Sequence, residues 1–371
     1  MDTTSSAYQL LELIALSGEC SPDVLQHLHI SPSYGEKLIT RLKSENYIKT
    51  HYKDQLRGYR LTSAGKKLLL SLHPERFSFY LSGNCDTNRP RSDYPRRLRL
   101  HQASMVYAML LAADITTFRD KKPRLFQPDV REPCSISPPV FYHSREIKEL
   151  GAETVKINNS RCIGILFAAK CIYPVFYTGD SLIKWEYRTE LKVKALLSYH
   201  ASQGILSAGH LKPSYHQDTP IRALLIGKGM DTSLKLLTST GGFQKSYFYL
   251  DTSFEHFHYI PDSREGTVML KLLCSPKLMN ALRDLLLSDL KPPCSDYGLE
   301  HDAVSDDLPV LLAFDFDMLK ISRFHTALSL HGIHGNLICF DFQKEILKLY
   351  FQKTVTITTI DLEKFERRFL S

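Results

Sequence analysis

Three charged residues in the middle of the chain have the order and spacing of a metal-dependent phosphodiesterase site. Asp129 follows a proline, and Glu146 and Lys148 stand two positions apart, with 16 residues between the two acids. In such a site the carboxylates hold a divalent cation, Mg²⁺ or Mn²⁺, against a phosphate group. The lysine positions the attacking water or stabilises the charge that develops on the phosphate. The spacing therefore predicts cleavage or nicking of DNA as one candidate activity.

This segment resembles the motif of PD-(D/E)xK nucleases. The apolar run 103–115 lies upstream, where that fold has a helix, and residues 139–148 are expected to form one strand with Glu146 and Lys148 on the same side. Pro138 shortens that strand, and a chain with 40 acidic residues contains such spacings by chance. Three interpretations stand: a working nuclease, a nuclease-derived fold without activity, and coincidence. We favour the absence of enzymatic activity.

A second candidate metal site is the triplet that contains His256 and His258. On a strand both imidazoles would face one side, where they could bind a metal that polarises a scissile phosphate. Tyr247, Tyr249 and Tyr259 lie near enough in sequence to supply a tyrosine nucleophile. None of these tyrosines falls on a clear downstream helix. The competing interpretation is two ordinary strand histidines.

The first quarter of the chain predicts a winged helix-turn-helix. Helical spacing of apolar residues covers 6–17, and Ser-Pro pairs open two further helices at 21–28 and 31–47. Two short strands, 47–52 and 58–61, flank a polar turn, and Thr62 then caps a fourth helix. Such a module places its third helix in the major groove of DNA and its hairpin, the wing, against the backbone or minor groove.

The charge of this quarter favours duplex DNA as the partner. Residues 1–100 hold 15 Lys and Arg against 10 Asp and Glu, whereas the remaining residues hold 32 against 30. A concentrated basic excess points to a polyanion, although winged helices also bind proteins and charges often form only a solvated face. Four residues of the third helix are candidates for reading bases, and four basic residues there and on the wing for contacting DNA: Ser33, Tyr34, Lys37 and Arg41, then Lys43, Lys53, Arg57 and Arg60.

The remaining pattern predicts a mixed α/β protein. A basic linker with five arginines is expected at 79–100, an α/β domain with the nuclease-like segment at 101–215, and a C-terminal α/β domain at 216–371, after the winged helix of residues 1–78. Periodicity predicts a hairpin near 162–179, a long helix that begins near Trp185, and further helices at 230–239 and 276–288. Apolar runs predict strands at 221–227, 257–261, 267–274, 308–316, 335–342 and 346–351.

The order of these features resembles the replication-relaxation family of plasmids and conjugative elements. The resemblance rests on "YRLTSAGKKLL" at 59–69, "RRLRLHQASMVYAMLL" at 96–111, "QPDV" at 127–130 and the segment from Trp185 to Glu190. It covers roughly residues 10–200. It implies a bacterial DNA-binding accessory protein of a mobile element that acts in replication or in relaxation of supercoiled DNA, without a catalytic mechanism.

Composition limits the remaining classes. Hydrophobic content of 43% and charged content of 23% are typical of a globular protein. No run is long enough to span a membrane and the N-terminus lacks a leader pattern, so a cytoplasmic location is expected. The eight cysteines form no CxxC pair, which argues against zinc ribbons. A homodimer, replication or transfer proteins as partners, and a regulator whose α/β body senses a ligand all stay open.

Overall fold

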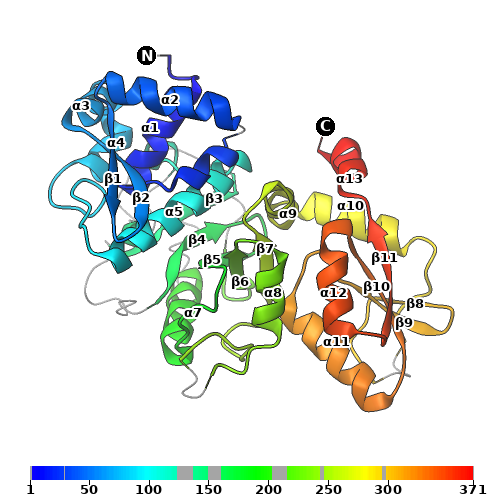
Figure 1. Ribbon diagram of the computed structural model, residues 1–371. Coiled ribbons are helices and arrows are strands. Elements are labelled where there is room, and N and C mark those ends of the chain that lie inside the picture. Colours follow the sequence, from blue (N-terminus) through cyan, green and yellow to red (C-terminus); the bar gives the residue numbers. More distant parts are fainter. Residues whose placement is uncertain are drawn as a thin grey trace. The chain divides into compact units, whose positions relative to one another are not determined.

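The computed structural model describes residues 2–28, 30–122, 137–148, 160–202, 215–242, 246–294 and 298–370. Within these residues it contains 13 α-helices and three open sheets of two, four and five strands, which confirms the predicted mixed α/β class (Figure 1). The chain forms two compact units, Met1–Arg124 and Leu125–Ser371. None of the helices in the described ranges is long and apolar enough to cross a membrane.

The first unit consists of helices and one β-hairpin, blue to cyan in Figure 1. Side-chain caps fix the starts of several elements, since Ser5, Ser21 and Thr62 accept hydrogen bonds from the backbone N–H groups of the first turn. Ser31 occupies the corresponding position before Pro32 without a side-chain cap bond. The elements in chain order are α1 (Ser6–Ser17), the 3-10 helix η1 (Pro22–Gln26), α2 (Pro32–Ser44), β1 (Ile48–Lys53), β2 (Leu56–Leu61), α3 (Ser63–Leu72), α4 (Pro74–Leu81) and α5 (Tyr94–Ala112).

The hairpin is tighter than the sequence predicted. Lys53 pairs with Leu56, so the turn consists of Asp54 and Gln55 alone. Both have positive φ, 52° and 59°, as a type I′ turn requires, and this turn matches the right-handed twist of the flanking strands. Cys20 forms an isolated antiparallel bridge with Tyr59, which ties the segment after α1 to the hairpin.

Part of the predicted basic linker is helical. Helix α4 ends at Leu81 and α5 begins at Tyr94, so the last seven residues of the predicted 79–100 linker lie in α5. Arg97 is fully buried in this helix rather than solvated. Since α5 contacts α1 and β2 within the first unit, the expected boundaries after residues 78 and 100 do not separate compact units.

The second unit, green to red in Figure 1, opens with a five-stranded sheet of order β3-β4-β5-β6-β7. Strands β3 to β5 form an antiparallel meander, and β5, β6 and β7 run parallel. Helices α7 (Tyr187–Ser202) and α8 (Met230–Leu237) supply the two parallel crossovers. Because β5 and β6 pair directly, the boundary expected between residues 215 and 216 is wrong. The strands are β3 (Val140–His143), β4 (Cys162–Phe167), β5 (Ile172–Gly179), β6 (Ala223–Gly227) and β7 (Phe257–Pro261).

A second sheet of order β11-β10-β9-β8 completes this unit. Its strands β9, β10 and β11 are parallel, and β8 is antiparallel to β9. Two predicted strands, 267–274 and 346–351, are helices here, and the strand that follows the second of them was missed. The elements are α6 (Ser144–Lys148), α9 (Arg264–Cys274), α10 (Pro276–Leu287), β8 (Ala303–Ser305), β9 (Leu308–Leu312), α11 (Met318–His331), β10 (Gly335–Phe340), α12 (Lys344–Phe351), β11 (Val355–Ile360) and α13 (Leu362–Phe369).

The segment after β9 joins the two sheets of the second unit. The backbone N–H of Tyr259 in β7 donates to the carbonyl of Phe316 at 3.1 Å, and His258 bridges Asp317 in antiparallel fashion. Nearby, Trp185 is 1% exposed and its indole N–H donates to Asp251 at 2.8 Å. Both contacts give buried polar groups a partner, as a dry interior requires.

Candidate nucleic-acid interface

Helix α2 separates a buried apolar side from an exposed polar side. Gly35, Leu38, Ile39 and Leu42 are buried, which confirms the expected inner face. The outer side carries residues that recur at helical spacing and can donate hydrogen bonds or attract phosphate. The exposed side chains of this kind are Ser33, Tyr34, Lys37, Thr40, Arg41, Lys43 and Ser44, and the acidic Glu36 is exposed on the same helix.

The hairpin continues this polar surface through the strand face that contacts α2. Alternation places Thr50, Tyr52, Arg57 and Tyr59 on one face of the hairpin. The Lys43 ammonium lies 5.8 Å from the centre of the Tyr59 ring, and the Arg57 guanidinium lies at the same distance from it. One cation from the helix and one from the hairpin therefore lie within cation–π distance of the same ring. We call this surface the α2–hairpin face: Ser33, Tyr34, Lys37, Arg41, Lys43, Tyr52 and Arg57.

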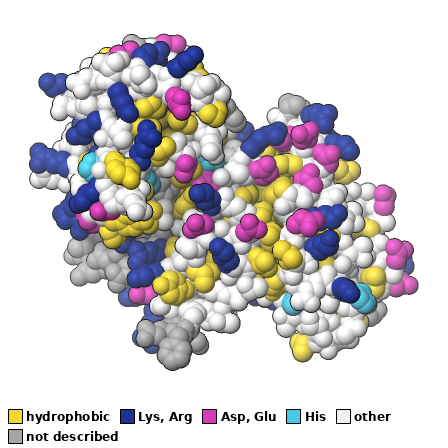
Figure 2. All heavy atoms as spheres, viewed as in Figure 1, with side chains coloured by type: hydrophobic (Ala, Val, Ile, Leu, Met, Phe, Trp, Pro, Cys, Tyr) yellow, Lys and Arg dark blue, Asp and Glu magenta, His cyan; other side chains and the backbone are white. Residues whose placement is uncertain are grey.

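The α2–hairpin face keeps most of its positive charge available. Arg41 lies 4.0 Å from Glu45, but both side chains are about half exposed and such a pair is weak in water. Tyr52 is 68% exposed, which is unusual for a large ring and adds a stacking surface. In the view of Figure 2, Lys and Arg side chains gather on the visible side of the first unit.

Arg60 does not belong to this face. It is 8% exposed, and its Nε donates to a Glu19 carboxylate oxygen at 2.7 Å. Its other nitrogens donate to the carbonyls of Pro90 and Arg91. The expectation that Arg60 contacts DNA is therefore corrected, because its guanidinium is already committed inside the protein. Lys53 is exposed beside the turn, on the opposite face of the hairpin from Arg57.

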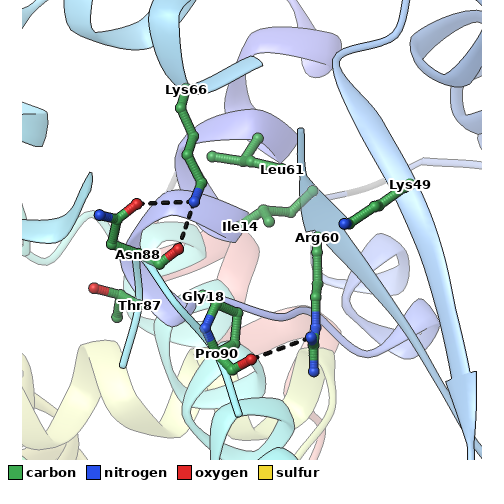
Figure 3. Close-up of a pocket in the computed structure, with 9 residues that line it drawn as sticks. All are labelled: Ile14, Gly18, Lys49, Arg60, Leu61, Lys66, Thr87, Asn88 and Pro90. Atoms are coloured by element: carbon green, nitrogen blue, oxygen red, sulfur yellow. Dashed lines mark hydrogen bonds between the residues drawn. The ribbon is translucent and has the colours of Figure 1, made fainter. Parts of the chain in front are cut away.

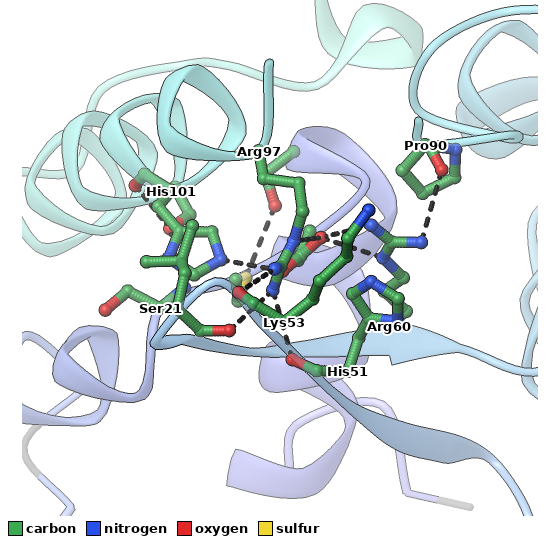
Figure 4. Close-up of polar contacts among 12 residues, drawn as sticks. Ser21, His51, Lys53, Arg60, Pro90, Arg97 and His101 are labelled. Carbon is green, nitrogen blue, oxygen red and sulfur yellow. Dashed lines mark hydrogen bonds and ion pairs between the residues drawn. The ribbon is translucent and has the colours of Figure 1, made fainter. Parts of the chain in front are cut away.

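A buried cluster around Glu19 fixes the position of the hairpin (Figure 4). Glu19 has no exposed surface and accepts hydrogen bonds from Arg60, Arg97 and His101. Arg97, which is equally buried, also donates to the carbonyls of His51, Lys53 and Leu56 at 3.1, 2.8 and 2.8 Å. One guanidinium from α5 thus holds the carbonyls on both sides of the hairpin turn.

The absence of a side chain at Gly58 provides the space that Glu19 and His101 occupy. A Cβ atom there would lie 2.2 Å from Glu19 Oε1 and 2.5 Å from His101 Nε2. This glycine lies within β2, opposite His51. Its role is close approach between the strand and a buried carboxylate.

The electrostatics of Glu19 follow from opposing effects. Burial raises the pKa of its carboxyl group, but hydrogen bonds from His101, Arg97 and Arg60 and the charge of Arg60 outweigh burial and lower the pKa to about 2. The carboxylate is therefore ionised at neutral pH and neutralises part of the charge of two buried guanidinium groups.

The nuclease-like triad is only partly described by the structure. Asp129 lies outside the described residues. Glu146 and Lys148 do not share a strand, because β3 ends at His143 and both lie on the short helix α6. Glu146 accepts the backbone N–H of His143 at 2.9 Å. The single strand expected over residues 139–148 is therefore wrong beyond His143.

The histidine pair belongs to a hydrogen-bonded corner. His256 Nδ1 lies 2.6 Å from Asp317 Oδ2, and His258 Nδ1 lies 3.1 Å from the Asp315 carbonyl oxygen. Burial raises the pKa of Asp317, but its contacts with His256, His258 and the Phe257 N–H outweigh burial and lower it to about 2. Asp317 also caps α11 through the N–H of Leu319.

His256 and His258 would need at least one further ligand to hold a metal ion. Among the described ranges, no group of three or more His, Cys, Asp or Glu side chains is placed to hold a metal ion. Of the three candidate tyrosines, Tyr259 is buried and donates to the carbonyl of Gly229, and burial raises the pKa of its hydroxyl. Tyr247 is 43% exposed and lies outside the helices.

Comparisons with known proteins identify no relative. No protein-family model matches the chain, and neither a curated protein nor a solved structure matches it.

Sequence reasoning missed the residues that hold the interface in place. Glu19, Arg97 and His101 were not singled out as candidate residues, and Arg97 was assigned to the basic linker. The spacing of Arg97 and His101, one helical turn apart, was the available signal, because it places both on one side of a helix.

We expect Glu19→Gln to destabilise the first unit by about 3–5 kcal/mol at pH 7, because two buried guanidinium groups lose their anion. The folded pKa lies below the ordinary 4.5, so the ionised group stabilises the fold above about pH 5 and this contribution is lost as the pH falls toward 2. The difference between wild type and variant should shrink over that window. Urea denaturation followed by circular dichroism measures it.

Two references make this measurement specific. Glu36→Gln, an exposed change on α2, should alter stability by less than about 0.5 kcal/mol. The only tryptophan, Trp185, lies in the second unit, so its fluorescence transition should stay in place. Equal stability of Glu19→Gln and Glu36→Gln at pH 7 would show that the cluster does not stabilise the unit.

Proposed function

We propose that the chain binds duplex DNA through a winged helix-turn-helix in its first unit. In this proposal α2 is the recognition helix and the β1–β2 hairpin is the wing. The order of α1, η1, α2 and the hairpin supports it, as does the bridge that adds Cys20 to the hairpin. The observation that carries the proposal is the α2–hairpin face, where one exposed cation from each element lies 5.8 Å from the centre of the Tyr59 ring.

The dimensions of α2 suit a major groove. Its 13 residues span about 20 Å at 1.5 Å per residue, and its exposed side is free of large aliphatic side chains. B-DNA presents a major groove about 12 Å wide that admits one helix. Ser33, Tyr34, Lys37 and Arg41 would contact base edges.

Phosphate contacts would come from the remaining cations of the interface. Lys43 and Arg57 flank the Tyr59 ring, and Lys53 stands next to the turn at the tip of the wing. Lys and Arg contacts to phosphate supply affinity without sequence preference. A wing held by Arg97 would present these groups in one geometry and so lose little conformational entropy on binding.

The biological setting proposed here comes from the resemblance to the replication-relaxation family. It suggests an accessory protein in replication or relaxation of a plasmid or conjugative element, or in control of that process. The second unit would then serve partners or assembly, and we favour a nuclease-derived or unrelated α/β body without cleavage activity. The segment around Asp129 keeps the nuclease hypothesis open to experiment.

The double substitution Lys37→Ala plus Arg41→Ala should abolish specific binding. Each good contact to a base edge contributes about 1–3 kcal/mol of discrimination, so the cognate affinity should fall on the order of 100-fold or more. The measurement is gel retardation, with DNA selected from a random-sequence pool by the wild type.

A matched control removes the same charge elsewhere. Lys67→Ala plus Lys277→Ala takes two exposed lysines from α3 and α10, outside the α2–hairpin face. It should change affinity only slightly. If the Lys37/Arg41 variant binds like the wild type, α2 is not the recognition helix. If both variants lose the same affinity, binding depends on net charge and not on the α2–hairpin face.

Substitution of the phosphate-contacting cations should have a different signature. Lys43→Ala and Arg57→Ala should each weaken binding about equally for cognate and unrelated duplexes, and lower the slope of log affinity against log salt by about 1. Fluorescence anisotropy over a salt series measures this slope. An unchanged slope in both variants would exclude these two side chains from contact with the backbone.

We further expect supercoiled plasmid DNA that carries the selected site to stay intact when it is incubated with the protein and Mg²⁺ or Mn²⁺. Agarose gels would reveal nicked or linear forms. Metal-dependent nicking that disappears in Asp129→Asn would instead establish the nuclease, because that carboxylate is the acid on which the motif depends.

A further inference from the structure

A polar pocket lies behind the hairpin in the first unit (Figure 3). Its volume is about 200 Å³. A water molecule takes about 30 Å³ in the liquid, so several waters or one small solute fit. Four parts of the unit line it: the end of α1, the hairpin, α3 and the loop before α5. The lining residues are Ile14, Gly18, Lys49, Arg60, Leu61, Lys66, Thr87, Asn88 and Pro90.

The pocket walls carry three cations and no acid. Lys49, Lys66 and Arg60 contribute the charges, and none of the lining residues is Asp or Glu. Arg60 gives most of its donors to Glu19 and to backbone carbonyls. Lys66 donates to the carbonyl and to the side-chain oxygen of Asn88, which leaves one of the three ammonium donors. Figure 3 shows the amine ends of Lys49 and Lys66 turned toward the pocket.

Lys66 lies close to two further cations. Burial lowers the pKa of its ammonium group, the Cys85 thiol raises it, and the neighbouring charges of Lys49 and Arg89 lower it. A group that is repelled by two cations and paired only with neutral oxygens is stabilised by an arriving anion. The pocket therefore offers positive electrostatic potential, hydrogen-bond donors and enough volume for an anionic ligand.

The pocket does not coincide with the α2–hairpin face. Lys49 pairs with Arg60 across the hairpin, two positions along from the pair His51 and Gly58, so these side chains share the face that meets Glu19. Arg57 and Tyr52 occupy the other face. The rim is open at Lys49, which is exposed, whereas Arg60, Leu61 and Thr87 in the lining are buried.

We propose that this pocket binds a small anion with one or two phosphate groups, held by Lys49 and Lys66. The phosphate oxygens would accept from the two ammonium groups and connect β1 to α3. Bound in this way, the anion would tie the hairpin to α3 and reduce its motion. The inference concerns a ligand free in solution and stands apart from DNA binding.

The test uses the full chain with inorganic phosphate and pyrophosphate as probes. Isothermal titration calorimetry should show one site, with pyrophosphate tighter than phosphate. Lys49→Gln and Lys66→Gln should each weaken pyrophosphate binding on the order of tenfold or more, because each removes a charge-assisted hydrogen bond. Lys67→Gln, an exposed change on the same helix α3, should bind like the wild type. Hydrogen exchange of β1 and β2 should slow when pyrophosphate binds.

Because Lys66 also holds Asn88, the exposed Lys49 variant keeps the test independent of any folding defect. Equal affinity of wild type and Lys49→Gln, or an equal loss in Lys67→Gln, would overturn the site. A parallel measurement of duplex DNA binding identifies whether the phosphate comes from a free anion or from DNA. If Lys49→Gln weakens duplex binding in the absence of pyrophosphate as strongly as Lys37→Ala plus Arg41→Ala, the pocket holds a DNA phosphate and the inference is wrong.

Discussion

The buried carboxylate of Glu19 organises the first unit. Two guanidinium groups and an imidazole surround it, so positive charge exceeds negative charge within an interior that excludes water. Removal of these ions from water costs several kcal/mol each unless every donor finds an acceptor. Here the surplus donors reach backbone carbonyls of the hairpin and of the loop before α5. The cluster therefore compensates its own desolvation by fixing the irregular backbone around it.

This arrangement gives the two kinds of arginine in the first unit opposite roles. Arg60 and Arg97 act inward, where they hold backbone, and Arg41 and Arg57 act outward, where they stay hydrated. The contacts of the inward group add to the other interactions of the hairpin, which are its two-residue turn, the bridge to Cys20 and the burial of Ile48, Tyr59 and Leu61. A two-stranded hairpin is marginally stable in water by itself.

Local signals predicted the first unit well and the second unit less well. Helix caps at Ser21 and Thr62 and the apolar side of α2 depend on neighbours within a few residues, so the sequence contains the information. The roles of Arg60 and Arg97 depend on Glu19, 41 and 78 positions away, and no local pattern separates a buried arginine from a solvated one.

Apolar runs in the second unit were ambiguous for a different reason. The segments within α9 and α12 were predicted as strands, because a short, nearly continuous apolar run fits a buried strand and a buried helix equally well. The strand expected through Glu146 ended at His143, where the following residues turn into α6. Packing in the folded protein determines whether each of these segments is a helix or a strand. The hydrophobic periodicity of so few residues does not reveal that packing.

The hydrogen bonds from Arg97 to the hairpin also determine the shortest fragment of this chain that would keep the interface intact. A fragment that ends near residue 78, after the helix that follows the hairpin, would contain every side chain of the α2–hairpin face. It would lack α5, and with it the Arg97 side chain, which holds the carbonyls of His51, Lys53 and Leu56 together. Glu19 would then be left with Arg60 alone. The smallest autonomous piece consequently extends through Ala112, 34 residues beyond the boundary at residue 78 that the sequence pattern suggested.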